Sequence, residues 1–205
     1  MNEEEEEVEI NIITLGECGV GKTSIIKRIK FGKFEDNIKG TLAVDYFIVK
    51  KKYADKNIMI SLKYNDTNGQ EEMQGIIPVQ YIRDSQIVLL VFCNIETLNK
   101  LIQRWDSFYK EYIDIKSKFI LIGNKSDIFG ENKNEIERQG GLFAEKIDAH
   151  FITCSAKSAD NMDNLENYIF TEAKNYIKKN VKNNNKKTKL GNTNTNSNSK
   201  KRKCC

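Results

Sequence analysis

A glycine-rich octapeptide offers the clearest chemistry in the sequence. Residues 16–23 read GECGVGKT, a spacing that fits the GxxxxGK[ST] pattern of a loop that cradles phosphates. Its glycines let successive backbone N–H groups turn toward phosphate oxygens. Lys22 would bring a positive charge to the β- and γ-phosphates, and the Thr23 hydroxyl is a ligand for Mg²⁺. The alternative is an ordinary turn between a strand and a helix. We favour a nucleoside triphosphate site. Residues outside this loop must then recognise the base of the nucleotide.

The tetrapeptide at residues 124–127 is a candidate for reading the base. It reads Asn-Lys-Ser-Asp and directly follows an apolar run. The Asp127 carboxylate only accepts hydrogen bonds, so it suits the two adjacent donors of guanine and rejects adenine. Asn124 can tie this segment to the phosphate loop, and the aliphatic stem of Lys125 can cover the base. Alone, the tetrapeptide is equally compatible with a surface turn. Its pairing with residues 16–23 favours a guanine nucleotide.

A tripeptide near the end of the globular region supports the same base site. Ser155, Ala156 and Lys157 follow the apolar run 150–154. Small residues at a strand end let backbone N–H groups approach a base carbonyl. The tripeptide carries little weight alone, but its position after a strand favours a site shared with residues 124–127.

These functional segments lie between apolar runs that alternate with amphipathic stretches. The pattern predicts helices over 22–30, 97–113 and 162–177, with apolar residues at three- and four-residue spacing. Continuous apolar runs are typical of parallel strands buried on both faces. We therefore expect an α/β fold in three layers, a mostly parallel six-stranded sheet with helices on both faces. The expected strands span residues 8–15, 43–53, 56–64, 87–93, 118–123 and 150–154.

The positive charge is concentrated near the end of the chain. The 205 residues carry a formal net charge of +4, yet ten of the 33 Lys and Arg and none of the 29 Asp and Glu lie in residues 178–205. The other residues hold 23 basic and 29 acidic groups, a net charge of −6. This distribution argues against a basic globular domain that binds nucleic acid. Electrostatic partners are expected to meet the tail.

Composition divides the chain into three parts. We expect an acidic disordered arm at 1–8, one globular domain at 9–177, and a disordered basic tail at 178–205, since the tail has too little apolar surface to offset its ordering entropy. The apolar runs are far shorter than the roughly 20 residues of a spanning helix. The acidic N-terminus does not resemble a secretory signal. Five scattered cysteines favour a reducing, cytosolic setting without a disulfide framework or a zinc site.

Several further motifs, in order, make the chain resemble a small GTPase of the Rab family within the Ras superfamily. Gly40–Phe47 resembles the Rab TIGVDF segment, and Asp66–Glu71 matches DTAGQE. Ile77–Ser85 resembles the IPSYIRDS pattern of Golgi-type Rabs, and Phe34 stands where the family stacks a phenylalanine on guanine. The resemblance covers about residues 8–177 and the last two cysteines. It implies a P-loop GTPase fold for residues 9–177.

The resemblance implies a molecular switch that binds Mg²⁺ with GTP or GDP. Thr23 and Thr41 would ligate Mg²⁺, Asp66 would hold it through water, and Gly69 would bond the γ-phosphate. Gln70 would be the catalytic residue that orients the attacking water. Effectors would contact Leu42, Val44, Tyr46, Phe47 and Tyr81. The nucleotide-binding residues it implies are Gly16, Glu17, Cys18, Gly19, Val20, Gly21, Lys22, Thr23, Ser24, Phe34, Thr41, Gly69, Asn124, Lys125, Asp127, Ser155, Ala156 and Lys157.

The chain ends in Cys204 and Cys205, preceded by four basic residues. This is not a CaaX box but resembles the ending on which Rabs receive two geranylgeranyl groups. Two lipid chains anchor stably where one binds marginally, and basic residues add attraction to anionic lipids. The resemblance further implies effectors, an exchange factor, a GAP, Rab escort protein and GDI as partners. It implies vesicle trafficking at the cytoplasmic face of Golgi, endosomal or vesicle membranes, with a cytosolic pool.

Some residues depart from the family pattern. Asn68 replaces the alanine of DTAG, where an amide beside Mg²⁺ and the γ-phosphate would disturb hydrolysis or exchange. Asn65 replaces a tryptophan expected on the effector face, so apolar contacts there would fall to Tyr46, Phe47 and Tyr81. Residues 71–73 lack the usual arginine-aromatic continuation, and Ile38 replaces a tyrosine. Tolerated drift on a solvated loop is the alternative for all of these departures; we favour drift for Ile38 and Glu72 and a functional effect for Asn68.

Two other functions stay open at this stage. Asn68 would allow a GTP-binding scaffold with little or no turnover. The +10 tail could instead be a nucleic-acid arm, although the near-neutral body and the Cys-Cys ending argue against nucleic acid as a partner.

Overall fold

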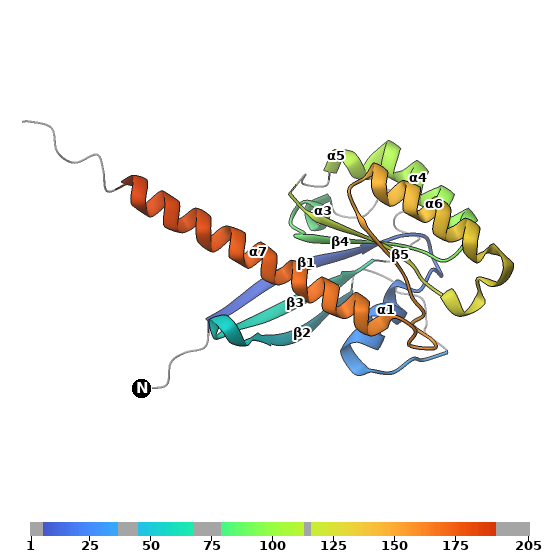
Figure 1. Cartoon of the computed structure of the whole chain (residues 1–205), viewed down its shortest axis with the longest axis horizontal. Coiled ribbons are helices and arrows are strands. Elements are labelled where there is room, and N and C mark those ends of the chain that lie inside the picture. The colour runs from blue at the N-terminus through green and yellow to red at the C-terminus, as the bar shows by residue number, and fades with distance from the viewer. Residues whose placement is uncertain (1–5, 37–44, 68–78, 113–115, 192–205) are drawn as a thin grey trace, which may run out of the picture.

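The computed structural model describes residues 6–36, 45–67, 79–112 and 116–191. They form a six-stranded sheet in the order β2-β3-β1-β4-β5-β6 (Figure 1). β2 runs antiparallel to β3, and every other neighbouring pair is parallel. The strands are β1 (Glu6–Leu15), β2 (Asp45–Tyr53), β3 (Ile58–Asp66), β4 (Ile87–Phe92), β5 (Lys118–Gly123) and β6 (His150–Thr153).

Helices cover both faces of this sheet (Figure 1). α1 and α7 pack on one face, while α4 and α6 pack on the other. The helices are α1 (Lys22–Phe31), α3 (Val79–Arg83), α4 (Ile95–Arg104), α5 (Lys110–Tyr112), α6 (Lys133–Lys146) and α7 (Met162–Gly191). A π-helical stretch, Trp105–Tyr109, joins α4 to α5, and short 3₁₀ turns lie at Ala54–Lys56, Ser126–Ile128 and Gly130–Asn132.

Strand alternation sends neighbouring apolar residues into two separate cores. Ile12 joins the cluster that contains Ile25 of α1 and Leu165 of α7. The next residue, Ile13, joins the opposite cluster with Leu98 of α4 and Phe143 of α6. β4 is buried along its whole length. The expected three-layer α/β fold, with a mostly parallel sheet covered on both faces, is confirmed.

The sheet begins earlier than the sequence pattern indicates. The expected acidic arm extends through residue 8, but β1 starts at Glu6 and its first residues pair with Ile58–Ile60 of β3. The Glu7 carboxylate accepts hydrogen bonds from Lys50 and Ser61. These bonds lower the pKa of Glu7 below its ordinary value. The paired backbone and the bonded carboxylate explain why a glutamate-rich segment lies in a strand.

α7 is longer than expected. The periodicity predicts a helix end near Ile177 and a disordered tail from residue 178, whereas α7 continues to Gly191. No Gly or Pro occurs between Met162 and Leu190, so no helix-breaking residue interrupts the segment. The Lys174 and Lys178 ammonium groups each lie 5.9 Å from the centre of the Tyr53 ring, which ties the helix to β2 where it leaves the expected range. None of the described helices has the length and apolarity needed to cross a membrane.

Two other helices differ from the expectation. The helix expected over 97–113 starts at Ile95, because the Asn94 side chain caps it, and the π-helical stretch interrupts it. The sequence pattern does not predict α6, because glycines 140 and 141 weaken its helical pattern.

The two glycines of α6 give a test of its packing on β6. A Cβ at Gly140 would lie 2.6 Å from Cζ of Phe151, whose ring stacks on Phe92, whereas a Cβ at Gly141 meets no described atom within 4 Å. Alanine favours a helix over glycine by about 1 kcal/mol. We expect Gly141→Ala to raise the free energy of unfolding by about 0.5–1 kcal/mol and Gly140→Ala to lower it by about 1–3 kcal/mol. Urea denaturation measures both, and equal stabilities would contradict the contact.

Candidate nucleotide-binding site

The phosphate loop connects β1 to α1 and needs glycine at two positions. Gly16 has a φ of +143° and Gly21 a φ of +98°, conformations that L side chains rarely adopt. A Cβ at Gly16 would collide with the carbonyl oxygen of Val91 in β4, and one at Gly21 with the side-chain amide of Asn124. The loop is therefore pressed against β4 on one side and against the segment after β5 on the other.

Lys22 is the first residue of α1 and is buried, with 5% of its surface exposed. Its ammonium group donates hydrogen bonds to the carbonyl oxygens of Gly16 and Glu17. A long cationic side chain is thus folded back onto the loop that precedes it. This geometry places a positive charge where the loop would bind phosphates.

Thr23 and Asp66 bring two hard oxygen ligands together. The Thr23 hydroxyl donates to Asp66 Oδ2 at 2.6 Å, and Thr14 donates to Asp66 Oδ1 at 3.4 Å. Asp66 lies at the end of β3 and is fully buried, and this burial raises the pKa of its carboxyl above the ordinary value. A hydroxyl beside a carboxylate suits Mg²⁺, which binds one or two such protein oxygens and substrate phosphates. The donor set therefore fits the predicted metal.

Asn124 joins the two predicted loops, as the sequence suggests. Its buried side chain donates from Nδ2 to the carbonyl oxygen of Val20 at 2.8 Å, and its Oδ1 accepts from the backbone N–H of Ala156 at 3.2 Å. Lys125 adopts a left-handed backbone and donates from Nζ to the carbonyl oxygen of Gly19 at 2.7 Å. The segment after β5 is thus fixed to the phosphate loop at two points.

Asp127 and the tripeptide after β6 lie side by side. The Ser155 hydroxyl donates to Asp127 Oδ1 at 2.5 Å and accepts from the backbone N–H of Ser158. Asp127 itself is exposed. One carboxylate oxygen is oriented by Ser155, and the group presents acceptors only. The structure therefore brings the predicted base-reading residues together, 28 residues apart in sequence.

The remaining predicted nucleotide contacts divide into two groups. Glu17, Cys18 and Ser24 lie in or beside the phosphate loop, and Phe34 packs partly buried against the core on the α1 and α7 face. The other two, Thr41 and Gly69, lie outside the described residues. So do the catalytic candidate Gln70, the effector candidates Leu42 and Val44, the lipidation candidates Cys204 and Cys205, and the departures Ile38 and Asn68.

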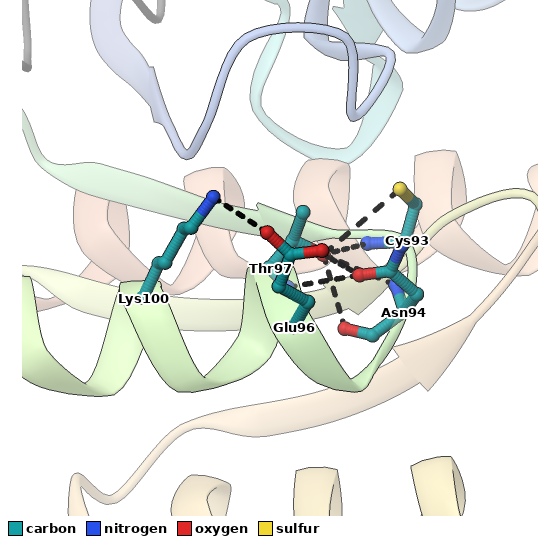
Figure 2. Close-up of polar contacts among 5 residues, drawn as sticks. All are labelled: Cys93, Asn94, Glu96, Thr97 and Lys100. Carbon is teal, nitrogen blue, oxygen red and sulfur yellow. Dashed lines mark hydrogen bonds and ion pairs between the residues drawn. The ribbon is translucent and has the colours of Figure 1, made fainter.

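A compact set of bonds fixes the start of α4, as Figure 2 shows. Asn94 Oδ1 accepts from the Thr97 backbone N–H at 2.8 Å, and Thr97 Oγ1 accepts from the backbone N–H of Asn94 at 3.1 Å. This reciprocal cap satisfies the backbone N–H groups of Thr97 and Asn94. Lys100 pairs with Glu96 at 2.8 Å, which raises the pKa of Lys100, and Glu17 of the phosphate loop raises it further.

The predicted effector residues that the structure describes differ in how much of their surface is exposed. Tyr46 and Tyr81 are exposed, at 67% and 42% of their surface, whereas Phe47 is partly buried under the ammonium group of Lys30. Asn65 is only 3% exposed and donates to the carbonyl oxygen of Ile12. The short amide of Asn65 thus turns inward to bond β1, and its side chain offers no exposed apolar surface where the family carries a tryptophan.

Sequence reasoning missed several residues that support the site. Thr14 bonds Asp66, Asp160 accepts from the Ser126 hydroxyl at 3.0 Å, and Arg28 bonds the carbonyl oxygens of residues 156 and 157. A polar residue at the end of an apolar strand is the one signal that points to Thr14. Arg28 belongs to no motif, since it only lies six residues after Lys22 on a helix.

These loops gather at the carboxyl ends of parallel strands, where open α/β sheets bind ligands. Sheet, phosphate loop and base segment together define a P-loop nucleotide-binding protein. The chain belongs to the Ras family, whose model matches residues 11–191. It is similar to Ras-related protein Rab-30 of Homo sapiens, with 27% identity over 165 residues and 80% of each chain covered. The resemblance to a divergent Rab-like small GTPase is thereby confirmed, and with it the general capacity to bind GTP, GDP and Mg²⁺ and to hydrolyse GTP.

Proposed function

We propose that this chain is a prenylated Rab-like switch that recruits effectors to intracellular membranes in vesicle trafficking. The observation that carries the switch is the single assembly formed by the phosphate loop, Asn124 and Ala156. A bound guanine nucleotide would touch both ends of this assembly, its phosphates at Lys22 and its base at Asp127.

The described residues divide the chemistry between them. Lys22 would neutralise phosphate charge, Thr23 would ligate Mg²⁺, and Asp66 would hold the metal through water. Asp127 would select guanine by accepting from its two donors. Mg²⁺ would neutralise charge on the phosphate oxygens as it builds up during transfer. We assign Gln70 the orientation of the attacking water. No protein nucleophile is required, because positioning and charge stabilisation carry phosphoryl transfer.

Loss of the γ-phosphate would supply the switch signal. We propose that Thr41 and Gly69 hold the triphosphate state and are released after hydrolysis. Exposed Tyr46 and Tyr81 would offer the apolar contacts that effectors read. An exchange factor, a GAP, Rab escort protein and GDI are the further partners that this cycle requires.

The end of the chain supports the membrane part of the proposal. Cys204 and Cys205 would carry geranylgeranyl groups, and Lys200–Lys203 precede them with four positive charges. Each basic residue near an anionic surface adds about 1 kcal/mol of attraction. We propose the cytoplasmic face of Golgi, endosomal or vesicle membranes as its location, with a cytosolic pool.

Asn68 gives the test of turnover. The full chain should purify with guanine nucleotide bound and hydrolyse GTP slowly, and Asn68→Ala should change the single-turnover rate or the nucleotide release rate by about tenfold, equivalent to about 1.4 kcal/mol. Chromatography of released nucleotide and quenched-flow hydrolysis measure these quantities. Wild type that retains GTP without turnover would favour a GTP-binding scaffold. If Asn68→Ala changes neither rate, Asn68 has no role in the cycle.

A further inference from the structure

Arg28 makes contacts that the nucleotide motifs do not account for. It lies on α1, and its guanidinium group donates from Nε to the carbonyl oxygen of Ala156 at 2.8 Å and from an Nη to that of Lys157 at 2.9 Å. A third bond, at 2.8 Å, reaches the carbonyl oxygen of Gly32 at the end of the same helix. The rigid five-donor fork of arginine matches three fixed carbonyl oxygens in a way that a single ammonium cannot.

The segment held by Arg28 has little regular structure of its own. β6 ends at Thr153 and α7 begins at Met162, so residues 154–161 lack a strand or helix ladder. Ala159 and Asn161 in this segment adopt left-handed backbone conformations, with φ of +66° and +57°. Such a segment keeps one conformation only when its surroundings fix it. Bonds within the segment, from the Ser155 N–H to the carbonyl oxygen of Asp160 and from the Ser158 N–H to Ser155 Oγ, close its turns. The bonds from Asn124 and Arg28 then fix its position relative to the phosphate loop and α1.

The Ala156 peptide is fixed from both sides. Its N–H donates to Asn124 Oδ1, and its carbonyl oxygen accepts from Arg28 Nε. Asn124 also bonds Val20 of the phosphate loop, and α1, which carries Arg28, starts directly after that loop. Phosphate loop, Asn124, Ala156 and Arg28 thus form a closed ring of contacts between segments more than 100 residues apart.

We propose that Arg28 is a positioning residue that holds the base-reading segment Ser155–Lys157 against α1 and thereby slows the release of guanine nucleotide. This inference rests on the proposed function, because it concerns how long the guanine nucleotide stays bound. Arg28 bonds the carbonyl oxygens of the base-reading segment, while Lys22, Thr23 and Asp66 are held by separate contacts. Its loss is expected to affect nucleotide release and to spare the hydrolysis step.

The test measures release of a fluorescent GDP analogue from the full chain into excess unlabelled GDP. Arg28→Ala should release it about tenfold faster, since it removes charged hydrogen bonds to the segment. Arg28→Lys, which keeps one donor group, should fall between wild type and Arg28→Ala. Lys27→Ala is the matched control, because it removes the neighbouring cation of α1, whose 2.7 Å ion pair goes to Glu35 instead. Its release rate should stay within about twofold of wild type.

A second measurement separates positioning from general destabilisation. The single-turnover hydrolysis rate of preloaded GTP should stay within about twofold of wild type in Arg28→Ala, since the phosphate contacts are untouched. Release that is unchanged in Arg28→Ala, or raised equally by Lys27→Ala, would overturn the inference, as would a parallel fall in hydrolysis. If Arg28→Ala does not fold, Arg28→Lys alone decides, and wild-type release from it overturns the inference. A wild-type chain that binds no guanine nucleotide would instead contradict the proposed function itself.

Discussion

Asp127→Asn is expected to lower the affinity for GDP by about a thousandfold. The carboxylate accepts from two adjacent donors of guanine, whereas an amide offers one acceptor and places a donor against a donor. The local structure should survive, because the amide oxygen can still accept from the Ser155 hydroxyl that bonds Asp127 Oδ1. Isothermal titration of the full chain with GDP measures the change.

A complementary nucleotide and a neighbouring variant control this experiment. Xanthosine diphosphate carries a carbonyl in place of the exocyclic amine, so it should bind Asp127→Asn better than GDP does. Glu131→Gln alters an exposed carboxylate four residues further along the chain and should leave GDP affinity within about threefold of wild type. Unchanged GDP affinity in Asp127→Asn would show that this carboxylate does not read the base.

Gly21→Ala is expected to have a second large effect, on both nucleotide affinity and stability. A methyl group there would displace the buried side chain of Asn124 and break its bonds to Val20 and Ala156. Each buried group left without a partner costs about 1–3 kcal/mol, and alanine at a positive φ adds about 1–2 kcal/mol. GDP affinity should therefore fall by at least about a hundredfold, as measured by nucleotide titration alongside thermal unfolding.

Gly19→Ala is the matched control within the same loop. Gly19 also has a positive φ, of +78°, but a Cβ there meets no described atom within 4 Å. Gly19→Ala should therefore introduce only the strain of alanine at a positive φ, and GDP affinity should fall by about tenfold. If the two variants lose equal affinity, the contact between Gly21 and Asn124 is not what fixes the loops together.

The strand framework was predictable from the sequence because burial on both faces produces uninterrupted apolar runs. The expected range 118–123 coincides with β5, and 87–93 exceeds β4 by one residue. The phosphate and base segments were predictable for a different reason. Their chemistry demands particular residues at the carboxyl ends of strands, so recognising each motif also predicts where it lies in the fold.

The features that the sequence did not predict depend on contacts that leave no periodic pattern of residues in the sequence. Glu6 and Glu7 read as solvated charges, yet backbone pairing and the partner Lys50 place them in β1. The burial of Asn65 was not predicted either, because the motif does not show that its amide donates to the carbonyl oxygen of Ile12. Arg28 acts through main-chain oxygens, which any residue at 156 and 157 would supply. Such contacts appear only once the chain is folded.

The position of β2 at the edge of the described sheet has a consequence for solubility. An edge strand of nine residues offers backbone groups with which a second copy could pair. Lys50, Lys51 and Lys52 lie consecutively on this strand, and two of their carboxylate partners, Glu7 and Glu166, come from β1 and α7. Successive side chains point to opposite faces of a strand, so edge-to-edge pairing of two copies would gather Lys50 and Lys52 of each copy on one face and Lys51 of each on the other. We expect this repulsion between like charges to oppose self-association through β2, while Tyr46, at the start of the strand, is exposed.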